Sequence, residues 1–193
     1  MALRQIRTYG DPVLEKKCKE VKEMTPRLQE LVDDMLETLY EQDGVGLAAP
    51  QVGVLRRITV IDLGIADEED EAGSQAEEQE ETAEQPQPDN LSPDGRVVPV
   101  WEGPLVLINP VIVETAGEQS GPEGCLSVPG KAGCVTRPNY VRVRALDRDM
   151  KEFEVEGTGL MARAMCHELD HLDGIVYVTK VEGDLYNTEE SEE

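Results

Sequence analysis

The chain has 193 residues, of which 39% are hydrophobic and only 4% aromatic, so its length and composition allow one domain with an aliphatic core. It carries 18 lysines and arginines against 41 aspartates and glutamates, which gives a formal net charge of −23. A charge of this sign repels phosphate backbones and anionic lipid surfaces, so we expect no direct nucleic-acid partner and no membrane partner.

The acidic residues are concentrated in two segments. Residues 67–94 hold twelve of them and no lysine or arginine, and residues 182–193 hold six more, so the rest of the chain is close to an ordinary balance. We therefore expect a single domain over residues 1–193, with a disordered acidic insertion at about 66–96 and an acidic tail at 182–193. Docking to a basic partner is the alternative interpretation of the insertion.

The sequence contains no targeting or spanning pattern. Residues 1–10 carry two arginines and no apolar run, and no stretch approaches the ~18 to 20 apolar residues of a membrane span, so a soluble cytoplasmic protein is expected. The four cysteines form no CxxC pair, and in a reducing compartment a special cysteine is a ligand or a nucleophile rather than half of a disulfide. They are Cys18, Cys125, Cys134 and Cys166.

The first predicted element is an amphipathic helix over residues 26–42. Thr25 and Pro26 match an N-cap and a first helical position, and Gly44 ends the pattern. Apolar residues at helical spacing predict a core-facing stripe, and acidic residues are expected to face water. The stripe comprises Leu28, Leu31, Val32, Met35, Leu36, Leu39 and Tyr40, and the acidic face comprises Glu30, Asp33, Asp34 and Glu37.

A glycine-rich segment, residues 44–53, follows this helix. Gly44-x-Gly46-x-x-Ala49 fits a dinucleotide-binding fingerprint, but a turn of that kind follows a strand and opens a helix. Here the segment follows a predicted helix, and Pro50 and Gly53 leave no room for another helix before Arg57. We interpret the segment as a wall that lets a substrate backbone approach. Gln51 is then a neutral hydrogen-bond donor.

Runs of β-branched residues predict the strands, and their shortness and the turns between them favour antiparallel sheets. The runs cover residues 57–63, 105–114, 135–137, 141–146 and 153–155.

The last predicted helix begins near Thr158 and continues to Gly174, with apolar residues on all sides. Such a helix is usually buried, yet this one also carries ionisable side chains, which survive burial only when they are paired or bound to metal. We therefore predict an α+β fold in which antiparallel sheets surround a buried central helix that carries the functional site.

His167, Glu168 and His171 form an HExxH pattern on this helix. Histidines at i and i+4 lie on one face and can bind a single divalent ion, and they are the only two histidines in the chain. Glu168 would lie beside that ion, where a carboxylate can take a proton from water. The alternative is a chance pair of histidines that hydrogen-bond to backbone carbonyls.

A hydrolytic site of this kind needs a third protein ligand. The metzincin extension would place a histidine at the position of Tyr177, and Glu182 and Glu189 lie in the acidic tail with little to hold them. Cys125, in the small-residue segment 123–129, is the strongest remaining candidate. The other three cysteines are better interpreted as small buried hydrophobes.

Three short segments together resemble the bacterial peptide deformylase family: GxGLAAxQ at residues 44–51, EGCLS at 123–127 and HExxHxxG at 167–174. The resemblance implies that Cys125, His167 and His171 bind one divalent metal ion, with water as the fourth ligand. Fe(II) is the ion that the family implies, and zinc, nickel or cobalt can replace it. The family reaction removes the formyl group from N-terminal formyl-methionine of new polypeptides.

The resemblance also implies residue roles. Glu168 relays the proton to the leaving amine, while the Gln51 amide and the Leu126 backbone N–H hold the oxyanion. Substrate-binding residues implied in the same way are Val45, Gly46, Glu123, Leu160 and Ala164, and His167 adds to the pocket wall.

The implied partners are N-formyl-methionyl nascent peptides, and a monomer is expected. Family members that contact the ribosome use a basic C-terminal helix, and the acidic C-terminus here disfavours that route for a transient ribosome contact. Two other functions remain as alternatives. A general HExxH metalloprotease would need an extended cleft and usually a zinc site without thiolate, and intact Glu168 and Gln51 argue against a non-catalytic metal-binding module.

Asp170 lies between the two histidines on the predicted buried helix and needs a cation. Arg137, at the end of the strand that follows the cysteine segment, is the arginine best placed to reach it, and Arg163 is the rival. We predict an Asp170–Arg137 pair that ties that strand to the histidine helix.

Overall fold

The structure is a computed structural model that describes residues 2–64 and 90–188. Most of the predicted acidic insertion and the last five residues of the tail lie outside these ranges. No helix of the described part is long and apolar enough to cross a membrane.

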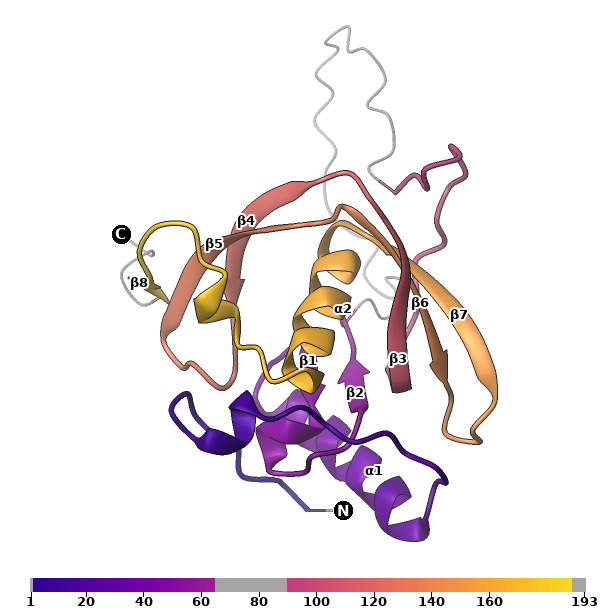
Figure 1. The fold of residues 1–193 in the computed structure, drawn as a ribbon, viewed down its shortest axis with the longest axis vertical. Helices are drawn as coiled ribbons and strands as arrows, with labels where there is room; N and C mark the ends of the chain where they lie inside the picture. The colour runs from indigo at the N-terminus through magenta and orange to yellow at the C-terminus, as the bar shows by residue number, and fades with distance from the viewer. Residues whose placement is uncertain (1, 65–89, 189–193) are drawn as a thin grey trace, which may run out of the picture.

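In residues 2–64 and 90–188, eight strands form two antiparallel sheets (Figure 1). The larger sheet has the order β1-β2-β3-β6-β7, and the smaller has the order β4-β5-β8. β3 continues into β4 and β5 into β6, so two long arms run from one sheet to the other. The strands are β1 (Gly46–Ala48), β2 (Ile58–Ile61), β3 (Leu105–Ala116), β4 (Gln119–Gly124), β5 (Lys131–Arg137), β6 (Tyr140–Leu146), β7 (Glu152–Thr158) and β8 (Tyr186–Asn187).

Helix α2 (Gly159–Leu172) lies between the two sheets. Ala162 and Met165 pack in one cluster with Leu107 and Val141 of the larger sheet, and all four are fully buried. Leu160 differs from the prediction of burial on all sides, because it lies in the first turn of α2 and is 56% exposed at the edge of a cleft. The HExxH segment therefore lies on a helix that packs against the larger sheet.

Helix α1 (Pro26–Glu41) covers the β1–β2 end of the larger sheet. Leu31, Met35 and Leu39 share a buried cluster with Leu47 and Ile58. The Thr25 hydroxyl accepts a hydrogen bond from the Leu28 backbone N–H at 3.4 Å, as the N-cap pattern predicts.

Two residues of α1 differ from their predicted exposure. Asp34, predicted to face water, is 1% exposed and forms a 2.6 Å ion pair with Arg4, because the N-terminal segment covers this side of the helix. Tyr40, predicted in the apolar stripe, is 50% exposed and donates a hydrogen bond to Asp62 at 2.9 Å.

Parts of both acidic segments have defined structure. Leu91 bridges Val97, and Arg96 pairs with Glu156 at 3.1 Å, so residues 90–96 do not belong to a disordered insertion. In the predicted tail, β8 pairs with β5. Three short 3-10 helices complete the described part: η1 (Pro12–Glu15), η2 (Ala49–Val52) and η3 (Tyr177–Thr179).

Candidate metal centre and active site

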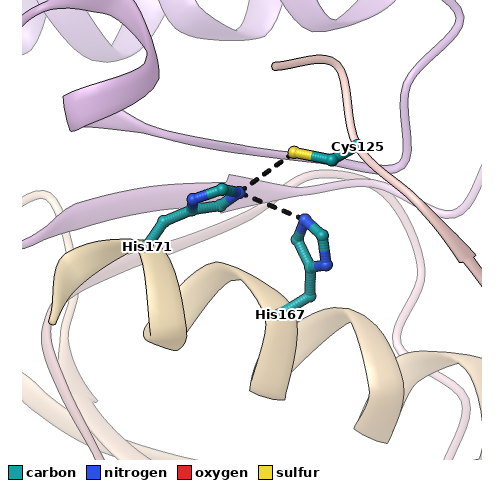
Figure 2. A group of neighbouring side chains, drawn as sticks. All are labelled: Cys125, His167 and His171. Carbon is teal, nitrogen blue, oxygen red and sulfur yellow. Dashed lines mark hydrogen bonds between the residues drawn. The ribbon is translucent and has the colours of Figure 1, made fainter. Parts of the chain in front are cut away.

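Cys125, His167 and His171 lie together, as Figure 2 shows. Cys125 follows the last residue of β4, and α2 carries both histidines one turn apart. The Cys125 Sγ lies 3.2 Å from His171 Nε2, which lies 3.1 Å from His167 Nε2. All three donor atoms fall within 4.8 Å of one another.

This donor set fits a divalent metal ion. Tetrahedral ligands about 2.0–2.3 Å from an ion lie roughly 3.3–3.8 Å from one another, close to the spacing of these atoms. One thiolate and two imidazoles leave a fourth position for water or substrate. Burial lowers the pKa of His171 well below its usual value. Burial also acts to lower the pKa of His167, but its hydrogen bonds with Cys125 and Glu123 raise this pKa to about 10.

Glu123 orients His167. Its Oε1 lies 2.6 Å from His167 Nδ1, so Nδ1–H donates to the carboxylate and Nε2 keeps its lone pair toward the centre. Arg137 donates to both oxygens of Glu123, at 2.6 and 3.1 Å, and Arg163 adds a third bond at 3.0 Å. Burial alone would raise the pKa of Glu123, but the hydrogen bonds from His167 and Arg137 lower it to about 2.

The predicted Asp170–Arg137 pair is present, with 2.6 Å between Asp170 Oδ2 and the Arg137 guanidinium. The rival, Arg163, bonds to Glu123 instead. Lys180 is a second partner of Asp170, at 2.7 Å, and the sequence analysis missed it. A chain of charges therefore runs from the surface through Asp170, Arg137 and Glu123 to His167.

Glu168 is 3% exposed, and its Oε2 has no hydrogen-bond partner within the described residues. Burial raises the pKa of Glu168 to about 7. Its side chain packs against Gly46, where a Cβ would lie 2.8 Å from Glu168 Cδ. Glycine at this position therefore makes room for the carboxylate.

Gln51 is 1% exposed and fixed at both ends of its amide. Its Oε1 accepts a hydrogen bond from the Ala48 N–H at 2.8 Å, so Nε2 is turned toward Cys125 Sγ at 3.5 Å and Ser127 Oγ at 3.1 Å. Ser127, fully buried, was missed by the sequence analysis, although it belongs to the EGCLS segment. In the described part of the chain no acceptor takes the Leu126 N–H.

A cavity of about 600 Å³ opens beside the metal centre. Glu123 lines it, but its carboxylate is engaged by His167, Arg137 and Arg163. Arg163 and Lys131 also line the cavity, and sequence reasoning had not placed them there. The residues predicted to bind substrate all line it: Val45, Gly46, Glu123, Leu160 and Ala164, together with His167.

A buried carboxylate next to a Cys/His/His donor set, with two amide donors beside it, is the arrangement of a metal-dependent hydrolase. The polypeptide deformylase family model matches residues 3–185. The chain belongs to this family, a family of metal-dependent hydrolases that remove the N-formyl group from nascent polypeptides.

Relatives and solved structures agree with this assignment. The chain is 54% identical over 187 residues to a peptide deformylase of Agathobacter rectalis, covering 97% of this chain and 95% of the relative. It is 50% identical to one of Lachnoclostridium phytofermentans over the full length of both. A peptide deformylase structure from Legionella pneumophila aligns with TM-score 0.73 and 36% identity, covering 94% and 87% of the two chains. An actinonin complex of the Ehrlichia chaffeensis enzyme aligns with TM-score 0.75 and 32% identity, covering 94% and 90%.

Proposed function

We propose that Cys125, His167 and His171 hold the metal ion of this deformylase and that Glu168, Gln51 and Leu126 carry out its hydrolysis of N-terminal formyl-methionine. The observation that supports this most directly is the buried Glu168 carboxylate, which follows the donor residue His167 on α2 and whose Oε2 has no hydrogen-bond partner within the described residues. When bound, a divalent ion supplies Lewis-acid polarisation of the formyl oxygen and lowers the pKa of water.

The chain's own residues divide the remaining steps. Glu168 accepts a proton as the water oxygen adds to the formyl carbon, and then delivers it to the amine nitrogen as the C–N bond breaks. Formate and a free N-terminal amine are the products. The Gln51 Nε2–H and the Leu126 N–H donate to the oxygen that gains negative charge, and the hydrogen bond from Ala48 keeps the Gln51 amide oriented.

The cavity positions the substrate. Val45, Leu160 and Ala164 offer an apolar surface to the methionine side chain, and the Gly46 backbone lies close enough to bond the peptide. Glu123 acts through His167 rather than on the peptide, since its oxygens already accept bonds from His167, Arg137 and Arg163.

Fe(II) is the proposed ion because the resemblance to the family implies it, and a donor set of one thiolate and two imidazoles also fits zinc. The test is formate release from a formyl-Met peptide by protein purified anaerobically with Fe(II), together with metal analysis. Turnover of the formylated peptide, with no cleavage of the same peptide lacking the formyl group, is expected. Cleavage of internal peptide bonds would instead indicate a general metalloprotease.

We further propose that the chain works as a monomeric single domain in the bacterial cytoplasm. One chain supplies every proposed site residue, and nascent polypeptides are cytoplasmic substrates. A monomer mass in size-exclusion chromatography with light scattering is the expected result, and a stable dimer would contradict it.

A further inference from the structure

A second cavity, of about 250 Å³, lies next to the active-site cavity. Leu160 lines both, and it belongs to the first turn of α2, seven residues before the metal-site residue His167. The rest of the second cavity is formed by Met161 of the same helix, by the end of β7 and by the segments that flank residues 65–89. Its large apolar lining residues, Pro99 apart, are here called the Trp101 shoulder: Leu63, Val98, Val100, Trp101, Leu160 and Met161.

The shoulder is apolar and open to solvent. Val100 is 58% exposed, Trp101 37% and Leu160 56%. The Trp101 ring is held against Phe153, with 6.4 Å between the ring centroids. Contiguous exposed apolar surface next to a cleft is typical of binding sites, and a rigid aromatic ring binds at low entropic cost.

The two acidic segments outside the described residues are poor in apolar side chains. Residues 65–89 contain one large apolar residue, Ile65, and residues 189–193 contain none. Acidic side chains lose hydration when they pack on an apolar surface. An occupant from outside the chain therefore matches the shoulder better.

We infer that the Trp101 shoulder binds an apolar side chain of the peptide substrate at the second or third residue, after the methionine. The inference rests on the proposed function, because the shared Leu160 makes the shoulder continuous with the cavity assigned to formyl-methionine. The enzyme then prefers nascent chains with an early apolar residue.

Matched substrates test this preference. The kcat/KM for formyl-Met-Leu-Ser-Ser or formyl-Met-Ser-Leu-Ser is expected to exceed that for formyl-Met-Ser-Ser-Ser by about fivefold, the scale of one partly buried apolar side chain. Trp101→Ala and Val100→Ser should reduce this gain to about twofold or less and leave the all-serine peptide unaffected. Val111→Ser is the control, because Val111 is an equally exposed valine, at 50%, that lines neither cavity.

Three kinetic results would overturn the inference: no leucine gain in the unchanged protein, a gain that survives Trp101→Ala, or an equal loss in Val111→Ser. Failure of all formylated peptides to release formate would refute the proposed function instead.

Binding can be followed without turnover, because Trp101 is the single tryptophan of the chain. The unformylated peptides Met-Leu-Ser-Ser and Met-Ser-Leu-Ser serve as probes. A shift of tryptophan emission to shorter wavelength is expected with at least one of them and not with Met-Ser-Ser-Ser. An unchanged emission with both leucine peptides would contradict binding at the shoulder.

Discussion

At the scale of single residues, the site depends on the buried Glu168 carboxylate, one of whose oxygens has no partner within the described residues. Glu168 Oε2 accepts no hydrogen bond within the described residues, so replacing Glu168 by the isosteric Gln leaves packing intact and removes only the proton acceptor. Glu168→Gln should bind one metal ion per chain and lower kcat by about 10²–10⁴, the usual contribution of general acid–base catalysis. Metal analysis and formate release check this, and near-normal turnover would disprove the assigned role.

The cysteines provide a matched set for the third metal ligand. Cys125→Ser replaces the soft thiolate and should sharply weaken metal retention, because ligation needs deprotonated sulfur. Cys166→Ser is the control: burial raises the pKa of Cys166 to about 11, so its thiol stays protonated. Cys134→Ser is a second control. Metal content after dialysis separates them, and retained metal in Cys125→Ser with loss in Cys166→Ser would show that the wrong cysteine was chosen.

Most residues of this site could be predicted from the sequence because they lie in short segments with characteristic spacing. The i, i+4 histidines and the cysteine were predictable from the sequence, as was the Asp170–Arg137 pair. The Lys180 partner of Asp170 and the hydrogen bond from Gln51 to Ser127 were not, because no spacing rule relates residues that meet only through tertiary folding.

At the scale of elements, Arg137 joins β5 to α2 and also to Glu123, next to the metal site. It is 4% exposed and bonds two carboxylates at once, which a lysine cannot do in the same geometry. Arg137→Lys should reduce metal affinity about 10- to 100-fold, the usual effect of disturbing the residues that orient a metal ligand. Competition with a chelator measures this.

The control for Arg137→Lys is Arg142→Lys. Arg142 also pairs with two carboxylates, Glu114 and Glu154, both at 2.9 Å, but on the exposed surface of the larger sheet. Its replacement should leave metal affinity unchanged. Equal losses in both variants would mean that Arg137 acts only through general stability.

Helix α1 is tied to the N-terminal segment by Asp34. Burial alone raises the pKa of this carboxyl, but hydrogen bonds from the Ala2 N–H and Arg4 outweigh it, so the pKa is lowered from 3.8. Because the folded-state pKa is depressed, the stabilisation is present above the unfolded value and is lost as pH falls through the folded one. Asp34→Asn should therefore reduce the free energy of unfolding at pH 7 and have a smaller effect below about pH 3.8. Urea unfolding at both pH values measures this, and an equal effect at both would contradict it.

The two helices and five β-branched strands were predictable because periodicity and caps are local signals. The spacing predicted a helix over residues 26–42, and α1 spans Pro26–Glu41. β1, β4 and β8 were missed. In β4, Gln-Ser-Gly-Pro-Glu-Gly has little strand propensity and forms a strand by pairing along its length with β5. The burial of Asp34 was also unpredictable, because Arg4 lies thirty residues away in sequence.

At the scale of the whole molecule, the acidic segment 66–88 is separate in sequence from the proposed catalytic residues. Residues 66–88 hold ten of the 41 acidic residues. The proposed catalytic and metal-binding residues all lie outside this segment: Gln51 precedes it, Cys125 and Leu126 follow it, and His167, Glu168 and His171 lie on α2. Catalysis on a short peptide should then be independent of that charge.

Replacing residues 66–88 by a linker of about ten glycines and serines tests this independence, because loop length affects stability only weakly. The exchange keeps Leu63 and residues 89–101, so the Trp101 shoulder remains. The kcat/KM for formyl-Met-Ser-Ser-Ser should stay within about threefold, while ten fewer acidic residues bring the net charge to about −13 and raise the isoelectric point. Replacing residues 66–88 by ten glutamates instead gives a linker of the same length that keeps the ten negative charges, and it is the control for linker length. A tenfold loss with the neutral linker but not the acidic one would show that the charge itself supports catalysis.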